Sequence, residues 1–154
     1  MPKCWYGLGH FIVLALLMPS LGHAATDAVL NARLEEGIGR VRAGDAPMAR
    51  AEAAEYLADL IHRAKPSSLD DKTIADIVSL LDIPDDSVRA WTAGALGHLG
   101  RRASVAAPKL SALLAEVDCL EGDLTSAASI RLALKRMGVT PTPEPSYNDC
   151  HKPK

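Results

Sequence analysis

The stretch from Asp85 to Leu114 constrains the fold more than any other part of this 154-residue chain. In its first half, apolar side chains recur at helical spacing and predict a helix with one broad apolar face. The residues of this face are Val88, Trp91, Thr92, Ala95, Leu96 and Leu99. Asp85 or Asp86 is placed to cap the start of the helix, and Gly100 to end it in a left-handed conformation. A second helix follows a tight break, with Ser104 as its expected N-cap and Pro108 near its start.

Two glycines lie inside the first of these helices, where each costs about 1 kcal/mol relative to alanine. Gly94 and Gly97 stand among Ala90, Ala93 and Ala95, so this helix is thin and another backbone can lie close against it. The alternative is that both glycines lie on the surface and are simply tolerated there.

The same stretch resembles the HEAT repeat, in the short HEAT-like form of phycobilisome-lyase-type proteins. That pattern is an acidic cap, then V-R, small residues at fixed intervals, an A-L-G-x-L-G ending and a second helix that opens near a proline. The matching residues are Asp86, Val88, Arg89, Ala93, Ala95, Leu96, Gly97, Leu99, Gly100, Ala107, Pro108, Leu110, Leu113 and Leu114. The resemblance implies stacked helical hairpins with an extended surface for a protein partner. Bilin chemistry is not carried over, because the sequence shows no chromophore pocket.

Internal similarity extends this pattern along the chain. An offset of 39 aligns Arg50, Ala51, Ala54, Leu57 and Leu60 with Arg89, Ala90, Ala93, Leu96 and Leu99. An offset of 33 aligns Ile77, Leu80 and Leu81 with Leu110, Leu113 and Leu114, and one of 38 aligns Ala95, Leu96, Leu99 and Gly100 with Ala133, Leu134, Met137 and Gly138. We therefore expect an all-α fold, a short right-handed α-solenoid of about three HEAT-like hairpins over residues 25–138. An unrelated six-helix bundle is the alternative.

The remaining helices follow from periodicity and from breaks at proline and glycine. Thr26 or Asp27 is expected to start the first helix, and Ser67 or Ser68 to cap the third. The expected helices cover about 26–41, 47–64, 69–81, 85–99, 105–117 and 125–137.

The first 24 residues read as a secretory signal peptide, because Lys3 precedes the apolar run from Phe11 to Met18. Cleavage is expected after Ala24 or Ala25, and an uncleaved anchor is the alternative. We expect a periplasmic or secreted protein without stable membrane insertion after cleavage. Loss of Lys3 leaves 16 basic and 19 acidic residues, a net charge of −3, which argues against a nucleic-acid partner.

Two cysteines remain after cleavage, Cys119 and Cys150, and an even pair in an exported protein predicts a disulfide. Such a bond would pin the proline-rich tail, residues 139–154, across the last hairpin. Two free thiols are the alternative.

Motifs of catalysis are nearly absent, so we expect a protein that is not an enzyme, with no cofactor and no metal. Asp59 and His62 stand three residues apart and are interpreted as a surface ion pair. Asp118, Glu121 and Asp123 are interpreted as a solvated acidic loop rather than a calcium site.

The candidates for partner binding are Arg89, His98, Arg101, Arg102 and Trp91. Arginines at hairpin ends can bind carboxylates bidentately, and Trp91 is either an anchor or, as its spacing favours, a core residue. The favoured function is an exported, non-catalytic protein-interaction module with a partner of unknown identity. The alternatives are a periplasmic immunity or inhibitor protein that neutralises a toxin, and a chromophore or metal carrier or lyase-like enzyme.

Overall fold

The computed structural model describes residues 21–118, 126–143 and 150, and all regular structure among them is helical. The α-helices are α1 Leu21–Ala43, α2 Pro47–Arg63, α3 Asp71–Ser79, α4 Asp86–Leu99, α5 Ala107–Val117 and α6 Ala127–Met137. Three short 3-10 helices are η1 Pro66–Ser68, η2 Leu80–Asp82 and η3 Gly100–Ala106. The all-α prediction is confirmed for these residues. Residues 1–20 of the expected signal peptide, Cys119 and most of the tail lie outside the described residues.

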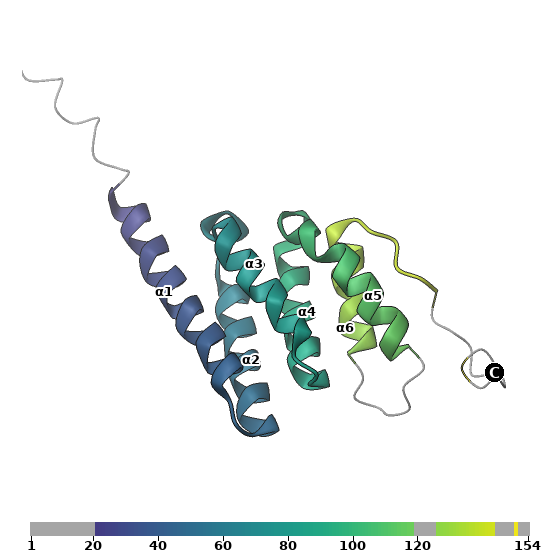
Figure 1. The fold of residues 1–154 in the computed structure, drawn as a ribbon. Helices are drawn as coiled ribbons and strands as arrows, with labels where there is room; N and C mark the ends of the chain where they lie inside the picture. The colour runs from purple at the N-terminus through teal and green to yellow at the C-terminus, as the bar shows by residue number, and fades with distance from the viewer. Residues whose placement is uncertain (1–20, 119–125, 144–149, 151–154) are drawn as a thin grey trace, which may run out of the picture.

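The helices form two layers (Figure 1). In one layer α2 packs against α4 and α4 against α6; α1, α3 and α5 cover this layer from one side. Consecutive helices are therefore neighbours in pairs, α1 with α2, α3 with α4 and α5 with α6.

One continuous aliphatic core lies between the layers. Its largest fully buried side chains are Leu34, Leu57, Ile61, Leu69, Ile74, Ile77, Leu80, Leu81, Leu96, Leu110, Leu114 and Ile130. Each such side chain stabilises the fold by about 1.5–3 kcal/mol relative to an exposed one. Ala51, Leu60 and Val78 lie on the apolar faces expected from periodicity and are only half-buried.

Two aspartates cap helices, Asp85 as predicted and Asp70 where Ser67 or Ser68 was expected. The carboxylate of Asp85 accepts from the N–H of Val88 at 3.2 Å, and that of Asp70 from the N–H of Thr73 at 2.6 Å. These bonds satisfy N–H groups that have no partner within the helix. The backbone bond from Thr73 holds the pKa of Asp70 below its usual value.

Three predicted helix starts are wrong. Ser67 and Ser68 lie in η1, where the Ser68 hydroxyl donates to the carbonyl of Lys65, and Asp70 caps α3 instead. Ser104 lies inside η3, which runs into α5 with helical angles at Ala106 and so leaves no extended capping residue. Helix α1 passes through Thr26 and begins at Leu21, because the adjoining alanines favour helix.

Two glycines with positive φ end helices. Gly138 adopts the left-handed conformation, and its N–H and that of Val139 donate to the carbonyls of Lys135 and Leu134 at the end of α6. Gly100 has φ 57° and ψ −133°, so its φ is positive but its ψ is not left-handed helical, because η3 begins at this residue.

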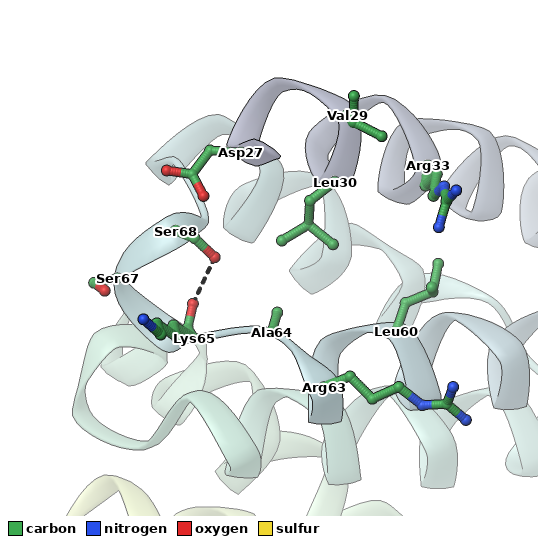
Figure 2. Close-up of a pocket in the computed structure, with 10 residues that line it drawn as sticks. All are labelled: Asp27, Val29, Leu30, Arg33, Leu60, Arg63, Ala64, Lys65, Ser67 and Ser68. Carbon is green, nitrogen blue, oxygen red and sulfur yellow. Dashed lines mark hydrogen bonds between the residues drawn. The ribbon is translucent and has the colours of Figure 1, made fainter. Parts of the chain in front are cut away.

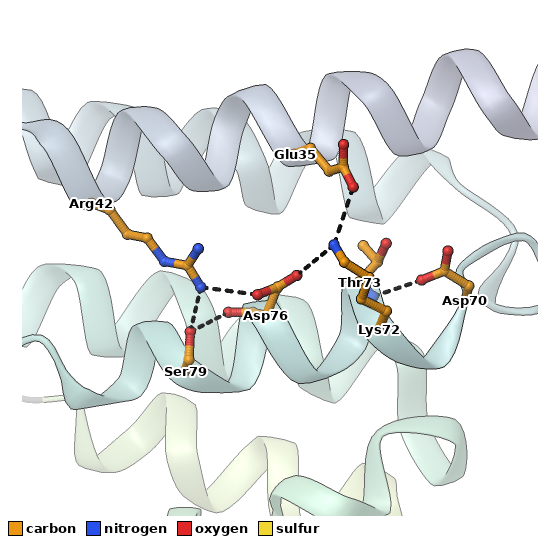
Figure 3. Close-up of polar contacts among 7 residues, drawn as sticks. All are labelled: Glu35, Arg42, Asp70, Lys72, Thr73, Asp76 and Ser79. Carbon is orange, nitrogen blue, oxygen red and sulfur yellow. Dashed lines mark hydrogen bonds and ion pairs between the residues drawn. The ribbon is translucent and has the colours of Figure 1, made fainter.

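Polar contacts tie α1 to α3 (Figure 3). Lys72 Nζ lies 3.2 Å from Glu35 and 3.1 Å from Asp76, and Arg42 lies 3.1 Å from Asp76 and 2.8 Å from the Ser79 hydroxyl. The bonds from Lys72 and Arg42 lower the pKa of Asp76. Exposed pairs of this kind contribute about 0–1 kcal/mol each, so they orient α1 on α3 more than they stabilise the fold.

Equivalent contacts occur at the later junctions. Arg50 at the start of α2 lies 3.6 Å from Asp85, and the Ser126 hydroxyl donates to Asp86 at 2.6 Å. Lys109 of α5 lies 2.5 Å from Asp82 of η2. Each pair of neighbouring hairpins is thus joined by at least one polar contact.

Candidate partner-binding surface

The exposed side of α4 carries the most prominent candidate. Ser87, Trp91, Gly94 and His98, which we call the α4 edge, lie three or four residues apart and therefore share one side of the helix. Trp91 is 39% exposed, whereas Val88, Thr92, Ala95, Leu96 and Leu99 are buried. The interpretation of Trp91 as a core residue is therefore wrong. Because α4 lies between α2 and α6, with Gly97 against Ala133 of α6, position 91 is left on the open side.

Gly94 leaves open space beside this tryptophan, since a methyl group built on it would meet nothing within 4 Å. It is one of the surface glycines that the alternative interpretation expected. An incoming side chain can therefore approach the helix at Gly94, next to the indole, without displacing any atom.

At the far end of the α4 edge, His98 meets His62 of α2. The two rings lie edge to face, with centroids 4.9 Å apart and planes at 79°. Burial lowers the pKa of His62, and the nearby charges of His98 and of Arg136 on α6 lower it further. This environment therefore disfavours the protonated form of His62.

The expected Asp59–His62 ion pair is not what α2 forms. Asp59 pairs with Arg63 at 2.6 Å, one helical turn away, while the ring of His62 turns toward α4. Asp59 acts on His62 only through its charge, which raises the pKa slightly against the stronger lowering effects.

The three candidate arginines are not brought together. Arg89 lies in the first turns of α4, and Arg101 and Arg102 lie beyond its last residue, roughly 15 Å farther along the axis. Arg102 donates to the carbonyl of Leu69 at 2.8 Å and to Asp71 at 3.0 Å, which fixes η3 against the start of α3. Arg101 is exposed and passes near Gly138. Arg89 lies ten residues (99 − 89) before the last residue of α4, about 15 Å of helix, so the spacing in the sequence already indicates that it cannot join the other two.

Exposed apolar side chains on the neighbouring helices were not foreseen from the sequence. Tyr56 on α2 is 44% exposed and lies under the guanidinium of Arg40 at 5.5 Å, and Leu132 on α6 is 49% exposed. Both residues fall outside the apolar stripe of their helix. In the sequence they are marked only as apolar residues at positions where the helical periodicity predicts a polar one.

A separate open cavity of about 640 Å³ lies between the first turns of α1 and the end of α2 (Figure 2). Its lining residues are Asp27, Val29, Leu30, Arg33, Leu60, Arg63, Ala64, Lys65, Ser67 and Ser68. They come from segments more than 25 residues apart, and no local motif indicated them.

The acidic loop and the cysteines are partly described. Asp118 pairs with Arg131 of α6 at 2.7 Å, in a site where both side chains are mostly buried, and Glu121 and Asp123 lie outside the described residues. The Cys150 sulfur lies 3.8 Å from the carbonyl oxygen of Asp118, the residue before Cys119.

Within residues 21–118, 126–143 and 150, no three His, Cys, Asp or Glu side chains are grouped so as to hold a metal ion. None of the helices there combines the length and apolar character needed to cross a bilayer. Comparison with models of known protein families, with curated proteins and with solved structures found no match.

Proposed function

We propose that the protein is an exported, non-catalytic protein-interaction module built on HEAT-like repeats, and that the α4 edge is part of its binding surface. The observation that carries this proposal is Trp91, an indole 39% exposed beside the open space at Gly94. Tryptophan is enriched among the residues that dominate binding energy, above all where it is buried only on binding.

The paired layers support the repeat architecture. His62 lies against His98 and Gly97 against Ala133, so the same separation of 36 residues (98 − 62 and 133 − 97) joins α2 to α4 and α4 to α6. A constant separation between laterally packed helices is what a solenoid of similar hairpins requires. In such a stack the layer of α2, α4 and α6 presents one continuous face, and Trp91 lies on its middle helix.

The charge along this layer suggests how a partner is oriented. Helix α2 exposes Glu52 and Glu55, and α6 exposes Lys135 and Arg136. A partner with opposite charges on the two sides of its apolar contact would therefore favour one orientation over the α4 edge.

The experiment is a pull-down from periplasmic extract with the chain from Ala25 onward as bait. Trp91→Ala is compared with Val105→Ala, which removes an exposed apolar side chain from η3, away from the α4 edge. We expect one partner to be retained by the wild type and by Val105→Ala and lost from Trp91→Ala, while thermal unfolding shows that both variants are folded. A partner that binds all three baits equally would remove the α4 edge from the proposal, and capture of none would contradict a constitutive interaction module.

A further inference from the structure

The cavity at the first hairpin has an apolar floor that the protein itself leaves partly uncovered. Leu30 of α1 and Leu60 of α2 point toward each other across it (Figure 2), and both are only half-buried, as is Ala64. This hairpin is the first of the described stack, so no earlier helix pair packs over it. An apolar surface at the end of a repeat stack is normally covered by polar capping residues.

The rim of this cavity is cationic. Arg33, Arg63 and Lys65 line it, against the single carboxylate of Asp27. Arg63 already pairs with Asp59 at 2.6 Å. Among the residues that the structure describes, the side chains of Arg33 and Lys65 have no ion-pair partner.

These two properties select the ligand. An apolar floor favours a flexible alkyl chain, because the contribution of burial grows with each methylene removed from water. Two unpaired cations at the rim favour an anionic head group and disfavour a cationic one. The volume of about 640 Å³ lies in the range of small-molecule sites, roughly 300–1,000 Å³.

We propose that this cavity binds an alkyl carboxylate, with its chain between Leu30 and Leu60 and its carboxylate at Arg33, whose side chain lies beside Leu60 (Figure 2). Lys65 and Ser67 lie at the opposite end of the cavity (Figure 2), and the Ser68 hydroxyl already donates to the carbonyl of Lys65. This site is distinct from the α4 edge, so it stands or falls independently of the proposed partner.

Binding of dodecanoate below its micellar concentration, measured by isothermal titration calorimetry on the purified protein, tests the head group and the chain. We expect dodecanoate to bind and dodecyltrimethylammonium, with the same chain and the opposite charge, to bind at least tenfold more weakly. Decanoate, which is two methylenes shorter, should bind up to roughly sixteenfold more weakly than dodecanoate, since each fully buried methylene contributes a factor of roughly four. Equal binding of the cationic and anionic amphiphiles, or no binding of dodecanoate, would overturn the proposal.

The location is tested by a matched pair of charge reversals. Arg33→Glu should weaken dodecanoate binding at least tenfold, whereas Arg101→Glu, the same charge change at an exposed residue outside the cavity, should leave it within twofold. Amide chemical-shift changes on the wild type give a second measurement that needs no variant. They should be confined to residues 27–33 and 60–68, and changes centred on the α4 edge would place the ligand elsewhere and contradict the assignment.

Discussion

A methyl group built on Gly97 would lie 2.9 Å from the Cα of Ala133 and 3.1 Å from its Cβ. Helices α4 and α6 therefore meet almost backbone to backbone at this pair, and the expected close approach is confirmed at Gly97. Gly94, three residues earlier, faces open space instead. The two glycines of α4 therefore have different roles, since Gly97 allows close packing against α6 and Gly94 does not. An alanine substitution at each position distinguishes the two roles.

Gly97→Ala should destabilise the protein and Gly94→Ala should stabilise it. Both substitutions favour the helix by about 1 kcal/mol, but at Gly97 the added carbon forces α6 away, and overpacking costs typically 1–3 kcal/mol. The free energy of unfolding, from urea titration, should fall by up to about 2 kcal/mol in the first variant and rise by up to about 1 kcal/mol in the second. Equal shifts of the same sign would show that α4 and α6 do not pack as closely as this.

Removal of the Asp70 cap should cost about 1 kcal/mol. Asp70→Ala loses the acceptor for the Thr73 N–H, whereas Asp70→Asn keeps one, since asparagine caps about as well as aspartate. The folded-state pKa of Asp70 is lowered, so its charge contributes stability above the unfolded value near 3.8, and this contribution is lost as the pH falls through the folded value. Unfolding at pH 7 and at pH 3 should show the difference between wild type and Asp70→Ala shrink at the lower pH.

His62 should make the protein less stable in mild acid. Its folded-state pKa lies below the unfolded value of 6.5 because of burial, His98 and Arg136, with Asp59 opposing them. The unfolded chain therefore binds more protons between these two values, and stability falls as the pH drops from 6.5 through the folded pKa. In His62→Gln the fall between pH 7.5 and 5.5, followed by chemical denaturation, should be smaller than in the wild type. An unchanged fall would assign the acid sensitivity to other groups.

Cys119 and Cys150 should form a disulfide in the exported protein. The Cys150 sulfur lies beside the residue that precedes Cys119, and a bond across 31 residues (150 − 119) contributes about 3–4 kcal/mol in the loop-entropy model. In the chain from Ala25 onward we expect no free thiol under denaturing conditions without reductant. Cys119→Ser, Cys150→Ser and the double variant should all lose about the same stability, and two titratable thiols in the wild type would contradict the bond.

Helical periodicity was sufficient to predict the number and approximate extent of the helices, because each apolar stripe is local in sequence. Side-chain capping was predicted for Asp85 and missed for Asp70. Ser67, Ser68 and Asp70 are all capable of capping a helix, and only the path of the backbone through η1 decides which of them precedes α3. The location of Trp91 depends on how much of α4 is covered by α2 and α6, which the periodicity of one helix does not contain. The cavity at Leu30 and Leu60 was missed because it also depends on how two helices pack, here α1 and α2.

The layered packing also bears on how the chain folds. Each helix makes its main contacts with helices one or two places along the sequence, so contacting residues are separated by about 40 positions or fewer in the pairs that join the hairpins. Low sequence separation lowers the entropic barrier to folding, and one-dimensional stacks gain stability hairpin by hairpin. We expect fast folding for a chain of this size, and hydrogen exchange that begins at α1, which has a neighbouring hairpin on one side only, while α4 in the middle of the stack exchanges last.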